Sequence, residues 1–432
     1  MVETKKSHLM HLLIVVVNIN LLLTTFIVYN TYHSIPRLNS VINFFFFAWC
    51  GSLFIISDLF WQGRVKWPMG TILLFVVYVL CGVFNQLVIF FDLILLYLWS
   101  LFFVYFVYKI YLLNTLNVNF IYEVIICFFM PLFVYLFGFL LHFTGYYFPV
   151  VWDQYLLAME GALGGFPSLM MGKMYQSFPF LIKTTVDFIY LALPYVFFII
   201  YRERKMQTQQ IPFDLLLEFV TIAIVGVLLY GLVPGCGTEA AFSGRWPDVS
   251  PLSFLQEGPQ WITCPASFPR NCVPSLHMAW MLCMVRRGLL CNTHIKCLMG
   301  IFFIGTIVGV FGLGAHYLVD IVVGLCFANI MGGSFSWRLH ASSARIQAIV
   351  GGAVMMIGWY LFIFFGLTLF ESSVILTRII FILSAALSLW IEYVLIKALS
   401  AVEKEILTSS VNQFTLETET PPSRDRQGAE KW

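Results

Sequence analysis

Apolar runs of roughly 20 residues recur along the chain, and this is the length that one α-helix needs to cross the hydrocarbon core of a bilayer. The pattern predicts an all-α polytopic membrane protein with about twelve transmembrane helices. Only Asn85, Gln86 and Asp92 separate the third helix from the fourth, so that boundary stays open. The first run has no small-residue cleavage site and is expected to remain as an uncleaved span. The expected spans are 9–31, 41–61, 68–89, 91–113, 119–143, 184–201, 211–233, 274–291, 297–315, 316–336, 347–368 and 373–398.

Three other segments are not apolar enough to cross a bilayer. Residues 144–183 combine glycines and Pro167 with aromatic residues and methionines. This mixture predicts an interfacial or re-entrant element, with an ordinary packed loop as the alternative. Residues 234–273 are polar and rich in proline. Residues 401–432 are charged or polar without apolar periodicity, and we expect them to form a disordered cytoplasmic tail.

The composition agrees with the apolar pattern and excludes several classes of protein. Hydrophobic residues make up 60% of the chain and charged residues 11%, and the mean hydropathy is +0.88. Soluble domains carry about 25% charged residues, so an ordinary water-soluble fold is excluded. The net charge of +2 provides no basic surface for nucleic acid.

The distribution of lysine and arginine predicts the orientation of the chain. An N-in, C-in arrangement places most basic residues of the short loops in the cytoplasm, as the positive-inside rule requires. The segments 144–183 and 234–273 then lie on the extracytoplasmic side. The expected cytoplasmic basic residues are Lys5, Lys6, Arg64, Lys66, Lys109, Arg202, Arg204, Lys205, Arg286, Arg287, Lys296, Arg338, Arg345 and Lys397.

Two histidines are expected to meet at this outer side. His277 follows Pro274-Ser275-Leu276 at the start of one expected span, and His316 lies where the next span returns outward. Asp320 is four residues after His316, one turn along the same helix face. Its carboxylate can accept a hydrogen bond from one ring nitrogen and leave the other free to attack. The alternative is a His–Asp pair that only satisfies itself at the interface, but ionisable groups at membrane depth favour function.

These residues resemble the signature motifs of a known enzyme family. Pro274-Ser275-Leu276-His277 and His316-x-x-x-Asp320 are similar to the second and third motifs of the type 2 phosphatidic acid phosphatase superfamily, including the single span between them. Tyr230-Gly-Leu-Val-Pro234 makes the resemblance closest to the branch that contains inositol phosphorylceramide synthase. The resemblance implies a six-helix catalytic core over 119–336. A four-helix membrane region (1–118), two C-terminal helices (337–400) and the tail (401–432) then lie outside the core.

The resemblance also implies a mechanism. His316 would attack phosphorus to form a phosphohistidine, and Asp320 would fix its tautomer. His277 would protonate the departing alkoxide and then activate the acceptor oxygen. Ser275 and backbone N–H groups at the start of the helix would hold phosphoryl oxygens. Membrane lipids would be the substrates, and neither a metal nor a cofactor is expected.

The chain departs from the family pattern in the first motif, a lysine seven residues before an Arg-Pro pair. Only the fragment Arg245-Trp246-Pro247 is present. A positive charge is still expected to bind the phosphoryl group in transit. Arg270, four residues before Pro274, is the first candidate and Arg245 the second. The absence of the complete first motif favours phosphotransfer over simple phosphatase activity, since synthases of this superfamily also lack the full motif.

The sequence is consistent with three functions. The first is a transferase that moves a phosphoryl or phosphoryl-alcohol group between lipids. The second is a hydrolase that removes phosphate from a lipid or polyprenyl carrier with the same histidines. The third is a transporter or scaffold, in which Asp58, Asp92 and Asn85 could line a path. No inverted repeat supports the third.

Three cysteines share the segment 234–273, namely Cys236, Cys264 and Cys272. Two of them can be bridged if this segment faces an oxidising compartment. The odd number would leave one free thiol, and the sequence alone does not select the pair.

Overall fold

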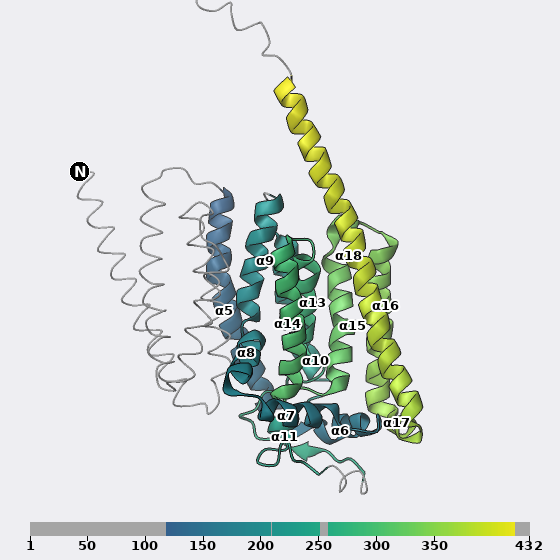
Figure 1. Cartoon of the computed structure of the whole chain (residues 1–432). Helices are drawn as coiled ribbons and strands as arrows, with labels where there is room; N and C mark the ends of the chain where they lie inside the picture. The colour runs from purple at the N-terminus through teal and green to yellow at the C-terminus, as the bar shows by residue number, and fades with distance from the viewer. Residues whose placement is uncertain (1–117, 209, 251–257, 420–432) are drawn as a thin grey trace, which may run out of the picture.

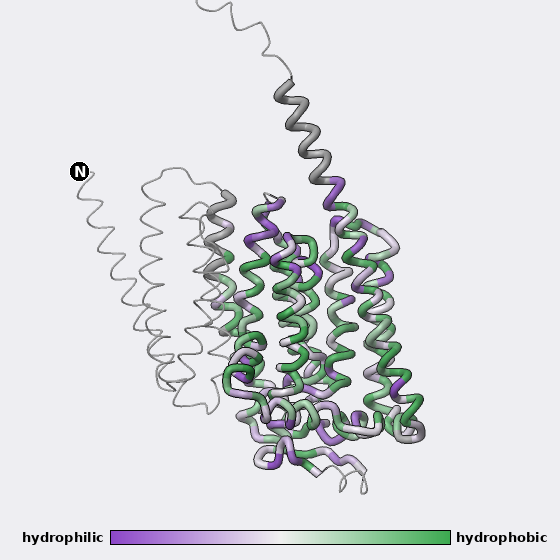
Figure 2. The backbone as a smooth tube through the Cα atoms, viewed as in Figure 1, coloured by the Kyte–Doolittle hydropathy of each residue, from purple (hydrophilic) through white to green (hydrophobic). Residues whose placement is uncertain are grey.

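The computed structural model describes residues 118–208, 210–250 and 258–419, which form a helical bundle with a layer of short elements across one end (Figure 1). The expected spans before residue 118 lie outside the described residues. Six helices of the described part are long and apolar enough to cross a membrane. The bundle is therefore that of a multi-pass membrane protein, and Figure 2 shows apolar residues along the helices.

The long helices follow the expected spans closely. They are α5 (Val118–Tyr147), α10 (Phe213–Tyr230), α14 (Thr293–Gly312), α15 (Leu318–Phe335), α16 (Ser343–Phe365) and α18 (Val374–Glu419). A further crossing is formed by α8 (Phe180–Leu191) and α9 (Leu193–Thr208), which are bent by 60° against each other. Pro194, near the start of α9, explains the break, because proline removes a backbone donor and clashes with the preceding turn.

The expected span 274–291 differs from the structure. Here α13 covers only Leu276–Gly288, 13 residues, which at 1.5 Å per residue is about 20 Å long and shorter than the hydrocarbon core of about 30 Å. Almost every residue of α13 is buried. An apolar run that is enclosed by protein, and not by lipid, does not have to match the bilayer thickness. Of the expected spans, eight lie within the described residues, where six helices, or seven crossings with the bent pair α8–α9, are long and apolar enough to cross a membrane.

A layer of short elements covers one end of the bundle (Figure 1). It contains α6 (Asp153–Gly161), α7 (Pro167–Ser177) and α11 (Thr238–Ala241), together with strand β1 (Val150–Val151), which pairs antiparallel with β2 (Ile262–Thr263). These elements come from the two segments 144–183 and 234–273. The remaining short helices are α17 (Leu367–Ser372) and the 3-10 helix η1 (Trp337–Leu339). We call the elements drawn from 144–183 and 234–273 the outer layer.

Helix α15 lies at the centre of the bundle and packs against α13, α16 and α18. Gly324 allows its close approach to α13, because a Cβ at this position would lie 2.7 Å from the carbonyl oxygen of Ser275. The backbone N–H of Ser275 donates to the carbonyl of Asp320 at 3.0 Å. A backbone hydrogen bond thus joins the Pro274–His277 motif to the His316–Asp320 motif, independently of any side-chain contact.

The opposite end of the bundle contains a buried ion network. Arg286 of α13 pairs with Glu218 of α10 and, at 2.6 Å, with Glu392 of α18. Arg287 pairs with Asp214 at 2.8 Å. Charges that are removed from water need partners of this kind, so the network joins α18 to the core.

The C-terminal helix is longer than the sequence predicts. Arg204 of α9 pairs with Glu403 of α18, and α18 continues to Glu419, beyond residue 401, where the sequence predicts a disordered tail to begin. The segment 403–405 is Glu-Lys-Glu, and these residues are good helix formers. An ion pair to the core together with good helix propensity explains the extension.

Candidate active site

The two histidines are brought together by the loops that precede α13 and α15. Ser275 is the N-cap of α13, so His277 lies in its first turn. Helix α14 ends at Gly312, Gly314 adopts φ +65°, and α15 begins at Leu318. His316 therefore lies in a loop, and not on the helix face that its spacing from Asp320 predicts. Its backbone N–H donates to the carbonyl of Val310 at 3.1 Å, which anchors the loop to the end of α14.

The imidazoles of His277 and His316 lie edge to face, with ring centroids 5.9 Å apart and planes at 67°. Asp320 Oδ2 lies 3.4 Å from Nδ1 of His316 and also accepts from the backbone N–H of Tyr317 at 2.8 Å. His316 and Asp320 are fully buried. Within the described residues, neither ring nitrogen of His316 makes a hydrogen bond, although Nδ1 faces Asp320, and the hydroxyl of Ser275 has no partner either. Buried polar atoms usually have partners in folded proteins, so these atoms are available to bind a ligand.

The ring of His277 is fixed by Tyr190, at the last turn of α8. The two rings stack with centroids 3.8 Å apart and an interplanar angle of 16°. Gly309 of α14 leaves room for this tyrosine, since a Cβ there would lie 3.1 Å from it. The sequence gives no signal for Tyr190, because an aromatic residue in an apolar run usually indicates only packing.

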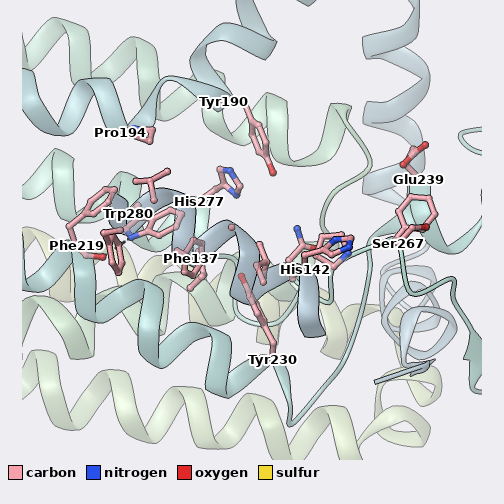
Figure 3. A pocket seen from close by; sticks show the side chains of 18 residues that line it. Phe137, His142, Tyr190, Pro194, Phe219, Tyr230, Glu239, Ser267, His277 and Trp280 are labelled. Atoms are coloured by element: carbon pink, nitrogen blue, oxygen red, sulfur yellow. Dashed lines mark hydrogen bonds between the residues drawn. The ribbon is translucent and has the colours of Figure 1, made fainter. Parts of the chain in front are cut away.

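An apolar cavity of about 250 Å³ lies beside His277 (Figure 3). In Figure 3, Phe219 and Trp280 lie at one end of the cavity and Glu239 and Ser267 at the other, with His277 between them. None of the described lining residues is lysine or arginine. The lining residues are Phe133, Val134, Phe137, Gly138, Leu141, His142, Tyr190, Pro194, Phe219, Tyr230, Glu239, Ser267, Phe268, Pro269, Asn271, Leu276, His277 and Trp280.

Two buried carboxylates of α6 hold the start of α15. Asp153 accepts from the hydroxyl of Tyr317 at 2.8 Å and from the backbone N–H groups of Cys236 and Gly237. Glu160 accepts from the backbone N–H of Leu318 at 2.6 Å and from the hydroxyl of Ser168. Neither residue is among the candidate site residues that the sequence predicts. Their spacing of seven places them on one helix face, which is the signal that could have identified them.

Burial raises the pKa of Asp153 to about 7, although hydrogen bonds from Tyr317, Cys236 and Gly237 lower it. Burial likewise raises the pKa of Glu160 to about 7, against hydrogen bonds from Ser168 and Leu318. A carboxyl whose pKa is higher in the folded than in the unfolded protein stabilises the fold while it is protonated. These contributions are complete below the ordinary pKa values of 3.8 and 4.5 and are lost as the pH rises through about 7.

We therefore expect the melting temperature of the purified protein to fall between about pH 5 and pH 8, as both carboxyls ionise in the folded state. The double variant Asp153→Asn/Glu160→Gln should lose most of this slope, since neither amide ionises. Thermal unfolding followed by intrinsic fluorescence measures the effect. Asp248→Asn is the matched control, because Asp248 lies exposed in the outer layer against Lys173. An equal slope in the double variant and the wild type would contradict the prediction.

In the structure, the guanidinium of Arg270 is engaged by backbone carbonyl oxygens. Its guanidinium is fully buried and donates to the carbonyl oxygens of Gly145, Phe148, Cys264, Pro265 and Phe268. Its backbone N–H donates to the hydroxyl of Thr144 at 2.8 Å. All three guanidinium nitrogens are thus engaged by the backbone of α5 and of the outer layer, and this geometry favours a structural role over the expected phosphate contact.

We expect Arg270→Ala to lower folded yield and the free energy of unfolding by roughly 3 kcal/mol or more, because the buried carbonyls lose charged donors. Arg270→Lys should restore little, since one ammonium cannot replace the guanidinium fork. Arg245→Ala is the matched control for stability, because Arg245 is exposed. Denaturation in a defined detergent measures all three variants. An Arg270→Ala protein with unchanged stability and lost turnover would restore Arg270 as the phosphate contact.

Arg245 lies exposed in the turn that follows α11. Its neighbour Trp246 packs against the histidine loop, since a Cβ on Gly314 would lie 2.8 Å from the Trp246 ring. Arg245 is therefore close in sequence to a residue that touches the loop of His316, but the structure gives its side chain no contact with the histidines.

Cys272 is a further buried residue that the expected site did not include. Cys272, His316 and Asp320 each offer one ligand atom, and these atoms lie within 4.8 Å of one another. Thiol, imidazole and carboxylate are donors that suit zinc. A metal bound here would coordinate a ring nitrogen of His316, either Nδ1, which Asp320 faces, or Nε2, which is expected to attack phosphorus. The absence of a resident metal therefore stays a prediction.

Comparisons with known proteins found similarity to the model of one protein family. Neither a search of curated proteins nor a search of solved structures gave a significant match. The match to a family model covers both histidines, Asp320, Ser275 and the α6 residue Glu160, but not α5, α16 or α18. Residues 154–333, from the first turn of α6 to the last turn of α15, match the model of the PAP2 superfamily.

Proposed function

We propose that the protein is a metal-independent lipid phosphotransferase that moves a phosphoryl or phosphoryl-alcohol group between lipid-type substrates through a phosphohistidine. One observation carries the proposal, namely the buried Nε2 of His316, which lacks a partner among the described residues, in a ring that lies 5.9 Å from that of His277, which lines an apolar cavity. The match to the PAP2 superfamily supports a lipid phosphatase or phosphotransferase.

In the first half-reaction, Nε2 of His316 attacks phosphorus, and the bond from phosphorus to the leaving alcohol breaks. His277 gives its proton to the departing alkoxide. Asp320 faces Nδ1 of His316 at 3.4 Å, where it favours the tautomer with the attacking lone pair on Nε2 and stabilises the positive charge that forms on the ring.

In the second half-reaction, His277 removes the proton of the acceptor hydroxyl, and the acceptor oxygen attacks the phosphohistidine. The bond between phosphorus and Nε2 breaks and returns His316 to its starting state. Ser275 and the positive end of α13 are proposed to bind the phosphoryl oxygens. The hydroxyl of Ser275 is buried without a partner among the described residues, which supports this role.

The surroundings of the histidines support a lipid alcohol as acceptor in preference to water. The cavity beside His277 is lined mainly by apolar and aromatic side chains, as expected for a site that holds acyl chains. His316 is fully buried and His277 is 8% exposed, so bulk water is largely kept from the reacting atoms. The resemblance of Tyr230–Pro234 and Pro274–His277 to the inositol phosphorylceramide synthase branch supports the same choice.

We also propose that the outer layer and the histidines face the extracytoplasmic side, with both termini in the cytoplasm. The supporting observation is the set of basic residues that flank the short connections at the opposite end, namely Lys205, Lys296, Arg338 and Arg345. Short loops rich in lysine and arginine stay in the cytoplasm.

The test is a reaction of the purified protein in lipid nanodiscs with a phospholipid donor, with and without a long-chain lipid alcohol. We expect a new phosphorylated lipid that appears only with the acceptor and is absent in the His316→Ala protein. Release of inorganic phosphate at the same rate with or without acceptor would favour the phosphatase alternative. Absence of both products with every donor, in a folded protein, would refute the proposal.

A further inference from the structure

Two of the three outer-layer cysteines meet in a buried contact. Cys236 lies between α10 and α11, and Cys264 directly follows β2. Their Sγ atoms are 2.8 Å apart, and the residues are only 6% and 2% exposed. The backbone N–H of Cys264 donates to the carbonyl of Pro149 at 3.0 Å, which continues the β1–β2 pairing. The backbone on this side is thus already ordered where the thiols meet.

The third cysteine is held elsewhere. The thiol of Cys272 donates to the carbonyl of Ala315 at 3.6 Å, and its sulfur belongs to the cluster with His316 and Asp320. The geometry therefore separates the three residues into one pair and one single thiol, a choice that the sequence leaves open.

We propose that Cys236 and Cys264 form a disulfide bond in the mature protein and that Cys272 remains a thiol beside the histidines. Each thiol of the pair loses its proton, and one S–S bond forms. The two electrons pass by thiol–disulfide exchange to a protein disulfide of the oxidising compartment, which is reduced to two thiols. This inference rests on the proposed extracytoplasmic position of the outer layer, because such bonds persist only where thiols are oxidised.

The disulfide would also fix one end of a series of hydrogen bonds that reaches the active site. Cys236 donates its backbone N–H to Asp153, and Asp153 accepts from the hydroxyl of Tyr317. The backbone N–H of Tyr317 in turn donates to Asp320 Oδ2. On the other side of the bond, the carbonyl of Cys264 accepts from Arg270 at 2.8 Å. Cys236 and Cys264 are thus positioning residues, because they act on Asp320 only through Asp153 and Tyr317.

The direct test maps the cysteines of the wild-type protein. Native membranes are denatured in the presence of an alkylating reagent, digested without reduction and analysed by mass spectrometry. We expect one crosslinked peptide pair that contains Cys236 and Cys264, with Cys272 alkylated. Three alkylated thiols, or a crosslink that includes Cys272, would overturn the proposal. This measurement needs no variant and therefore does not depend on whether a mutant folds.

A second test asks whether the bond positions the site. In Cys236→Ser/Cys264→Ser we expect a lower melting temperature and a turnover reduced about tenfold, as for residues that orient a reactive group indirectly. Treatment of the wild type with a reductant should reproduce the loss, and should leave the double variant unchanged. Cys297→Ser is the matched control, because Cys297 is exposed on α14 near the opposite end of the bundle. A double variant that responds to the reductant as the wild type does would remove the positioning role.

The two proposals fail in different ways. A protein that carries the Cys236–Cys264 crosslink but transfers no phosphoryl group would refute the proposed function alone. A protein that is active with three free thiols would refute the disulfide alone. Mapping and turnover are therefore measured on the same preparation.

Discussion

His316→Ala is expected to reduce turnover to background and to abolish any covalent phosphoenzyme. In the proposed mechanism, Nε2 of His316 is the only protein atom that bonds to phosphorus, so its removal leaves no first half-reaction. Asp320→Asn should have a smaller effect, because a wrong tautomer impairs the attack of His316 without removing the nucleophile. The measurement is acid-labile label on the protein after brief exposure to an activated, radiolabelled phosphate donor.

His294→Ala is the matched control for this experiment. His294 is an exposed histidine in the first turn of α14, near the opposite end of the bundle from His316. It should keep wild-type label and turnover. Label that persists in His316→Ala would transfer the nucleophile to another residue. Turnover without label in the wild type and every variant would exclude the covalent mechanism and leave only direct transfer.

The meeting of His277 and His316 could be predicted from the order of the apolar runs. Two apolar runs lie between the histidines, one that begins at His277 and one that returns to His316, so both histidines are placed on one side of the membrane without any knowledge of packing. The structure brings the rings to 5.9 Å. Hydropathy could not predict the helix length of α13, because an apolar run enclosed by other helices looks the same as one that faces lipid. The buried environment of α13 becomes visible only when α10, α14 and α15 are placed around it.

The contacts of Arg270 could not be predicted from the sequence. Its charge and its distance of four residues from Pro274 indicate a phosphate contact, but charge alone does not say which acceptors a guanidinium meets. In the structure the acceptors are backbone carbonyls of α5 and of the outer layer. Such contacts depend on how distant segments fold onto one another, and no periodic pattern encodes them.

Asp153 and Glu160 were missed for a related reason. The composition of the segment 144–183 predicts an interfacial element or a packed loop. Single carboxylates in such a segment usually contact water. Their partners Tyr317 and Leu318 are more than 150 positions away in the sequence. Only the tertiary structure reveals that these carboxylates accept hydrogen bonds from the start of α15.

His277→Ala should fail in a different way from His316→Ala. His277 is the proposed acid and base, so its loss slows both half-reactions with a lipid substrate, by roughly 100- to 10,000-fold. An aryl phosphate needs little protonation of its leaving group. We therefore expect His277→Ala to be labelled by an activated aryl phosphate, and the label to accumulate because the acceptor hydroxyl is no longer deprotonated. His316→Ala should stay unlabelled with the same donor.

The stacking of Tyr190 on His277 at 3.8 Å allows a check that this effect is chemical and not structural. His277→Phe keeps an aromatic ring against Tyr190 but has no proton to give. It should therefore match His277→Ala in turnover while it retains a melting temperature closer to that of the wild type. The measurement is the time course of label with the aryl phosphate donor, followed by addition of a lipid alcohol. Label that is lost in both His277 variants but retained in His316→Ala would exchange the two roles, with His277 as the nucleophile and His316 as the acid and base.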